Sequence, residues 1–231
     1  MRWRNGWMNK AIIIDTETSG FTEPDVIELA YSAPIEERHY HAIAPVCFTH
    51  RFMPTKAMDL GARAAHLITL GDLKGFPVWP GYWLQPPGTD YLIGHNIDFD
   101  WEALGKPKAK RICTLALARH TWPTIDSHSL GALMFHLFPE EDARAFVLRA
   151  HSAMADVVMC WALLCQLLIV HFPEKFTWEL VWLKSEIARV PSHMAFGKHR
   201  GMLIKDVPAD YKRWLLKQDD VDPYLRKALT Q

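Results

Sequence analysis

The spacing of hydrophobic and polar positions predicts a chain of short strands followed by helices. Apolar runs rich in β-branched residues, bounded by polar residues, glycine or proline, are typical of buried strands. Five such runs occupy residues 11–14, 26–32, 47–53, 91–94 and 111–113. Helices are predicted at residues 57–66, 115–120, 130–137 and 152–170, and a further helix opens after the fourth strand. This order predicts an α/β fold with a mixed sheet flanked by helices.

The sequence His171-Phe172-Pro173 interrupts the longest predicted helix and marks a domain boundary. Residues 1–171 are expected to form the main domain, and residues 172–231 a small C-terminal appendage with three short helices. The appendage carries 11 Lys and Arg against 8 Asp and Glu, although the whole chain is neutral with 26 of each kind. Tyr211 and Trp214 fit one apolar helical stripe, which predicts that both lie in the core of the appendage.

Composition places the chain among globular proteins. Hydrophobic residues make up 49% of it, enough to build a core and to exclude global disorder. The four cysteines form no Cys-x-x-Cys pair, which favours reduced thiols and a cytoplasmic protein. No signal peptide is predicted, and the longest apolar stretch, residues 161–170, is too short to cross a membrane.

Two carboxylates follow the first predicted strand. Asp15 and Glu17 are two residues apart, and because side chains alternate across a strand, both point to the same face. Like charges delivered to one place by an apolar strand are costly unless a cation neutralises them. Thr18 and the glycine that follows allow a ligand to approach the backbone closely.

A second polar segment follows the fourth strand, where Gly-His-Asn-x-x-Phe-Asp runs from residue 94 to residue 100. It contains Asn96 and two acids, Asp98 and Asp100, and spacing alone leaves both acids open as site residues. An Asp at the start of a helix is usually an N-cap, a role that suits Asp98.

A third segment, His-x-x-x-x-Asp, begins the longest predicted helix with His151 and Asp156. Five helical residues turn through roughly 500°, which would leave the two side chains ~140° apart. They converge only if His151 lies on the loop that enters the helix. Alone, this pair is also compatible with an ordinary surface histidine.

The three segments together, in this order, resemble the DEDDh exonucleases of the ribonuclease H-like superfamily. The resemblance assigns Asp15 and Glu17 to the first motif, Asp100 to the second, and His151 and Asp156 to the third. The sister DEDDy class would need a tyrosine at position 152, where this chain has serine.

Further stretches resemble the exodeoxyribonuclease X family nearly from end to end. They are Ala65–Thr69, Arg111–Thr114, and Phe196–Gly201 together with Tyr211 and Trp214. The resemblance implies a five-stranded mixed sheet, and 3′→5′ hydrolysis of single- and double-stranded DNA. Contacts with the substrate are expected from Thr18, His66 and Asn96.

The implied chemistry explains the residue types. Four carboxylates suit two Mg²⁺ or Mn²⁺ ions, which prefer oxygen ligands and can clamp a displacement at phosphorus. His151, with an unperturbed pKa of roughly 6.5, suits a general base near neutral pH. Asp15, Glu17, Asp100 and Asp156 are therefore the expected metal ligands.

Two other functions fit parts of the pattern. An RNA 3′→5′ exonuclease of the same fold, similar to ribonuclease T, would share every motif, because only contacts to the sugar 2′ oxygen differ. A non-catalytic nucleic-acid-binding module would have a broken acid set, whereas this set is complete. In the appendage, Lys198 and Arg200 lie in a glycine-flanked turn and are expected to contact phosphates of the DNA.

Overall fold

The structure is a computed structural model of the chain, and it describes residues 10–37, 45–148, 152–194 and 196–230. Its centre is a five-stranded sheet in the order β3-β2-β1-β4-β5. Pairing is antiparallel between β1, β2 and β3 and parallel between β1, β4 and β5, so the predicted mixed sheet is confirmed. The strands are β1 (Lys10–Thr18), β2 (Val26–Ser32), β3 (Cys47–Arg51), β4 (Thr89–Gly94) and β5 (Lys110–Cys113).

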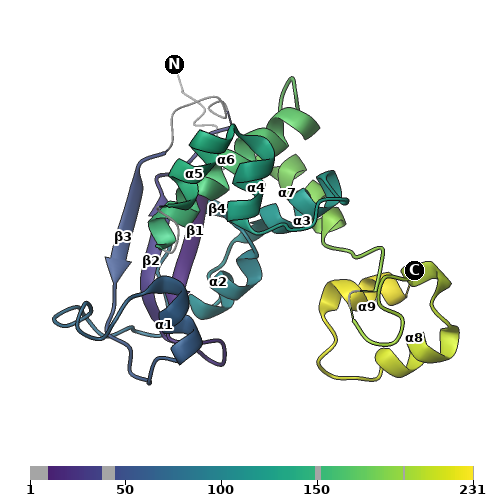
Figure 1. Ribbon diagram of the computed structural model, residues 1–231, viewed down its shortest axis with the longest axis horizontal. Helices are drawn as coiled ribbons and strands as arrows, with labels where there is room; N and C mark the ends of the chain where they lie inside the picture. The colour runs from purple at the N-terminus through teal and green to yellow at the C-terminus, as the bar shows by residue number, and fades with distance from the viewer. Residues whose placement is uncertain (1–9, 38–44, 149–151, 195, 231) are drawn as a thin grey trace, which may run out of the picture.

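Helices cover both faces of this sheet (Figure 1). In chain order, the α-helices of the described residues are α1 (Leu60–His66), α2 (Ile97–Ala103), α3 (Thr114–Thr121), α4 (Leu130–Leu137), α5 (Glu140–Val147), α6 (Ala153–His171), α7 (Trp178–Ala188), and then α8 (Ala209–Leu215) and α9 (Pro223–Leu229), which lie away from the sheet. Helix α5 was not predicted from the sequence; it begins with three acids, Glu140, Glu141 and Asp142. Those acids suit a first turn, where they interact favourably with the helix dipole.

Strand β1 separates two hydrophobic cores. Ala11 and Ile13 face the core that contains α4, α6 and α7. Ile12 and Ile14 face the other core, which contains α2. Because β1 runs on to Thr18, the alternation continues through the polar residues, which lie within the strand rather than after it as the sequence predicted. Odd-numbered side chains of β1 therefore point towards α6, and even-numbered ones towards α2.

Helix α6 is the main helix of the first core. It is the one helix among the described residues long and apolar enough to span a membrane. Its buried side chains, which include Val157, Leu164 and Leu168, pack in the core shared with β1, β2 and α4. Burial in the fold therefore accounts for its apolar composition.

The C-terminal residues build a separate small core around Met194, Ile204 and Leu225. Figure 1 shows α8 and α9 as a lobe set apart from the sheet. We call residues 196–230 the C-terminal lobe. Helix α7 does not share its core, because Trp178 and Val181 are buried in the first core. The domain boundary after residue 171 stays a proposal, and the contacts of α7 favour placing it after that helix instead.

The junction between the two parts is charged. Arg189 follows α7, and its side chain is only 4% exposed. Its guanidinium donates to the Asp98 carboxylate of α2 at 3.2 Å and to the Tyr224 hydroxyl of α9 at 2.6 Å. The Tyr224 hydroxyl in turn donates to Glu186 at 2.9 Å. Arg189 thus contacts one helix from each part.

Candidate active site

Three carboxylates from distant parts of the chain meet at one end of the sheet. Asp15 and Glu17 lie on the face of β1 that points towards α6, and Asp156 lies in the first turn of α6. One ligand oxygen from each lies within 4.8 Å of the others. The strand alternation inferred from sequence is responsible, because it sends both β1 acids to the side where α6 begins.

Asp100 completes the acidic group from the opposite face of β1. Its carboxylate accepts hydrogen bonds from the Thr16 amide at 2.9 Å and from the Thr16 hydroxyl at 2.7 Å. Thr16 lies between the two β1 acids, so these bonds fix Asp100 next to them. Asp100 is 4% exposed.

Asp98 has a different environment. It is paired with Arg111 and Arg189, away from the three-carboxylate cluster. The predicted N-cap role of Asp98 is wrong, since α2 begins after Asn96 and Asp98 lies inside its first turn. The structure thus separates the two acids that spacing could not, and it brings Asp100 to the cluster.

Burial and like charges raise the pKa values of these carboxyl groups. Burial is the largest cause for Asp15, followed by the charges of Asp100 and Asp156. The same kinds of cause, burial first and Asp156 second, raise the pKa of Glu17 to about 8. Burial also raises the pKa of Asp100, against the lowering effect of its bonds from Thr16. Such a group is costly to ionise without a cation, which is typical of a metal site.

Glu28 is a fifth carboxylate, and the sequence reasoning missed it. It lies opposite Glu17 in the β1–β2 register and is 2% exposed. One carboxylate oxygen accepts from the Ala153 amide at 3.1 Å, and the other from Arg51 Nε at 2.7 Å. Glu28 therefore ties the start of α6, just ahead of Asp156, to the sheet. The available sequence signal was an acid between the apolar residues Ile27 and Leu29 of a predicted strand.

The residues expected to contact substrate have contrasting environments. Thr18 is buried, and its hydroxyl donates to the Gly20 carbonyl at 2.8 Å. His66 is also buried, and its Nδ1 accepts from the Ile68 amide at 2.9 Å. Burial lowers the pKa of His66. Asn96 is exposed and adopts a left-handed backbone with φ of 74°.

The remaining predicted residues lie elsewhere or outside the described part. His151 lies outside the described residues. Lys198 and Arg200 are exposed on the C-terminal lobe, in a turn whose glycines, Gly197 and Gly201, have φ of 70° and 83°. Positive φ explains why glycine flanks this turn on both sides.

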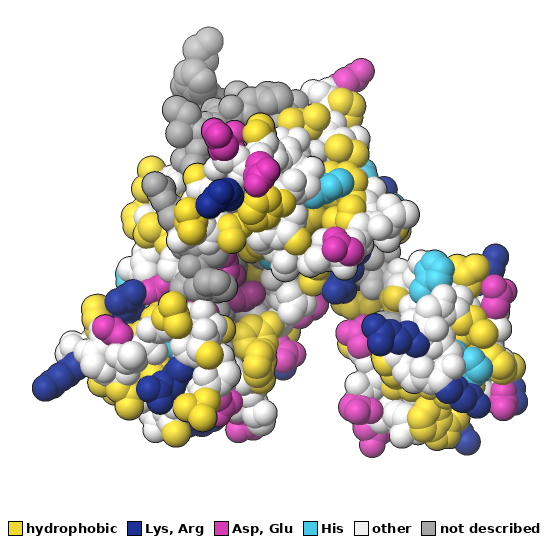
Figure 2. All heavy atoms as spheres, in the orientation of Figure 1, with side chains coloured by type: hydrophobic (Ala, Val, Ile, Leu, Met, Phe, Trp, Pro, Cys, Tyr) yellow, Lys and Arg dark blue, Asp and Glu magenta, His cyan; other side chains and the backbone are white. Residues whose placement is uncertain are grey.

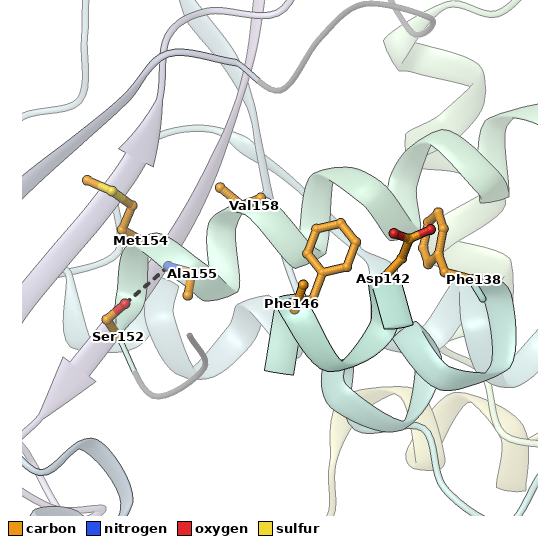
Figure 3. A pocket seen from close by; sticks show the side chains of 8 residues that line it. Phe138, Asp142, Phe146, Ser152, Met154, Ala155 and Val158 are labelled. Atoms are coloured by element: carbon orange, nitrogen blue, oxygen red, sulfur yellow. Dashed lines mark hydrogen bonds between the residues drawn. The ribbon is translucent and has the colours of Figure 1, made fainter. Parts of the chain in front are cut away.

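A largely apolar pocket lies between α5 and the first turns of α6 (Figure 3). Its volume is about 630 Å³. Phe138 and Phe146 line one end, and Ser152 and Met154 the other. None of the clustered acids lines this pocket, so it is separate from the candidate metal site.

Solved exonucleases share this fold. A structure described as Exonuclease X in complex with 5′ overhanging duplex DNA matches with a TM-score of 0.57 at 27% identity, covering 76% of this chain and 99% of that one. A zinc-bound complex of E. coli ExoI with single-stranded DNA matches in fold, with a TM-score of 0.56 at 15% identity, over 80% of this chain and 44% of that one. In fold, the chain is therefore similar to the class of exonucleases with a ribonuclease H-like fold.

Within this class the similarity extends along almost the whole sequence. The chain is 28% identical to exodeoxyribonuclease 10 of Escherichia coli (strain K12), over 94% of this chain and 96% of that protein. The same enzyme from E. coli O6:H1 matches equally well. No family model matches the chain. The resemblance to exodeoxyribonuclease X predicted from the motifs is confirmed.

Proposed function

We propose that the chain is a 3′→5′ exodeoxyribonuclease that removes nucleotides from DNA 3′ ends. The observation that carries this proposal is the meeting of Asp15, Glu17 and Asp156 within 4.8 Å, with Asp100 bonded to Thr16 beside them. DNA is the proposed substrate because the similar proteins are named or described with it. Both single-stranded and double-stranded ends are proposed, in a cytoplasmic enzyme.

The carboxylates fit divalent metal ions. Mg²⁺ and Mn²⁺ prefer hard oxygen ligands, and a cation would offset the repulsion that raises the pKa values of Asp15 and Glu17. Two bound ions would supply the charge that stabilises the attacking and leaving oxygens during displacement at phosphorus. The protein contributes fixed ligand positions: Thr16 holds Asp100, and Glu28 holds the start of α6.

His151 is proposed as the general base. The support is its place in the His-x-x-x-x-Asp motif, five residues before Asp156. A neutral imidazole can accept the proton of the attacking water at neutral pH. No side chain needs to act as a covalent nucleophile, because in this mechanism the water molecule attacks phosphorus directly.

Three residues are proposed to form the site of the terminal nucleotide. Thr18 and His66 are buried, so we assign them the shaping of the turns that border the nucleotide. Asn96 is exposed at the start of the helix that carries Asp100, and it can contact the substrate directly.

Purified protein should be incubated with Mg²⁺ and with DNA or RNA of one sequence, labelled at the 5′ end. The expected product is a ladder shortened from the 3′ end, formed faster from DNA than from RNA. Asp100→Asn is the inactive control, because it keeps the size of the side chain and removes its charge. Faster shortening of RNA would favour the ribonuclease T-like activity, and absence of cleavage for both would favour a binding module.

A further inference from the structure

The C-terminal lobe exposes an aromatic side chain that the sequence predicted to be buried. Trp214, on α8, is 53% exposed, although its neighbour Leu215 lies in the core of the lobe. The prediction was wrong for Trp214 because helical periodicity does not fix which edge of an apolar stripe faces the core. Tyr211, one turn earlier, is half-buried against that core and supports the Trp214 ring, with centroids 5.3 Å apart.

The glycine-flanked turn of residues 197–201, here called the basic turn, packs against the Tyr211 ring of this pair. Lys198 Nζ lies 5.3 Å from the centroid of the Tyr211 ring, and His199 contacts that ring edge-on at 4.6 Å. A Cβ on Gly197 would lie 2.6 Å from the Tyr211 hydroxyl, so glycine lets the turn sit directly on the tyrosine. The turn and the aromatic pair therefore form one surface.

This surface is rich in positive charge. Lys198 and Arg200 are exposed, and no ion pair between described residues involves either of them. Figure 2 shows that Lys and Arg side chains and hydrophobic side chains both reach the surface of this lobe. Cations without an ion pair, connected through Tyr211 to an exposed indole, supply the charge and the stacking ring that a surface needs to bind a nucleic-acid strand.

We propose that Trp214, Tyr211, Lys198 and Arg200 form an accessory site for single-stranded DNA. A base stacks on the exposed Trp214 ring, while Lys198 and Arg200 contact the neighbouring phosphates. A single strand is required because the faces of paired bases in a duplex are covered by their neighbours, whereas an unpaired base can leave its stack. This inference rests on the proposed function, since the bound strand is the one whose 3′ end is cut.

The test measures binding by the full-length chain in chelator, where no cutting occurs. Two labelled oligo(dT) strands are compared: one of about 4 nucleotides, which can occupy only the active site, and one of about 20 nucleotides, which can also reach the accessory site. A blunt duplex is the third ligand. The wild type should bind the long strand more tightly than the short one. Trp214→Ala should weaken the affinity for the long strand about tenfold and change the affinity for the duplex less than twofold.

Matched variants separate stacking from charge and from folding. Phe135→Ala removes an equally exposed aromatic ring, 48% exposed on α4, and should bind all three ligands like the wild type. Trp214→Phe keeps a ring and should retain most of the gain, which covers the case in which Trp214→Ala unfolds. Lys198→Ala with Arg200→Ala should flatten the salt dependence by about one unit of log–log slope per lost contact.

Two results would overturn the accessory site. Unchanged affinity of folded Trp214→Ala for the long strand, or a loss in Trp214→Phe as large as in Trp214→Ala, would remove the stacking role. An equal loss for strand and duplex would reduce the surface to a general phosphate site. Either result leaves cleavage itself intact, whereas an inactive wild-type enzyme would contradict the proposed function without altering these binding measurements.

Discussion

Replacing Glu17 with glutamine should stabilise the metal-free protein, and increasingly so as pH rises. Glu17 has a pKa of about 8 in the folded chain, against an ordinary value of 4.5. The folded state therefore binds this proton more tightly than the unfolded state, and ionisation works against folding. The cost is absent below the unfolded pKa, grows as pH rises from 4.5 to about 8, and is constant above.

The magnitude follows from the same pKa values. Each pKa unit corresponds to about 1.4 kcal/mol, so the full cost at high pH is at most about 5 kcal/mol. Neighbouring carboxyl groups share protons with Glu17 and part of its side chain meets water, so we expect about 1–3 kcal/mol. Glutamine has nearly the same shape and cannot ionise, so the variant avoids this cost.

Urea unfolding in chelator at about pH 6 and about pH 9 measures the effect. The gap in unfolding free energy between Glu17→Gln and the wild type should widen at the higher pH. Adding Mg²⁺ should stabilise the wild type more than the variant, because only the wild type offers the full ligand set. An equal gap at the two pH values would refute the electrostatic reasoning.

Three further predictions concern activity. Asp100→Ala should abolish cleavage, while Asp98→Ala, which removes only a pairing with arginines, should retain it; the reverse pattern in a gel assay would show that the wrong acid was chosen. His151→Ala should slow cleavage by roughly 10²–10⁴-fold with unchanged metal affinity by calorimetry, and lost affinity would contradict the role of base. Glu28→Gln should keep the bond to the Ala153 amide and cleave faster than Glu28→Ala, and equal rates would argue against a positioning role.

Much of the candidate site was predictable because it depends on local rules. The alternation of side chains along β1 sends Asp15 and Glu17 to one face, and the structure has this arrangement. The choice between Asp98 and Asp100 needed the resemblance, since both lie in the same turn of α2. The structural reason for the difference is nonlocal: Thr16 binds one acid, and Arg189, 91 residues from Asp98, pairs with the other.

The features that were missed depend on tertiary packing. Glu28 becomes meaningful only when Ala153, 125 residues away, presents its amide to it. Trp214 lies at the edge of an apolar stripe, and the small size of the C-terminal lobe leaves no second layer to cover it. Helix α5 is short and only Ala143 in it is buried, so most of its packing depends on the neighbouring helix α4.

The position of α7 has a consequence for the synthesis of the chain. All five strands and α6 precede residue 172, yet the first core remains open until α7 arrives. Trp178 fills that core with no exposed surface, and Ser185 accepts the Cys113 amide of the edge strand β5 at 2.8 Å. During synthesis the N-terminal part of the chain leaves the ribosome first, so β5 emerges before its partner Ser185, which lies 72 residues later in the sequence. During that interval the Cys113 amide lacks this partner, and an unpaired strand edge is a site at which an incomplete chain can aggregate.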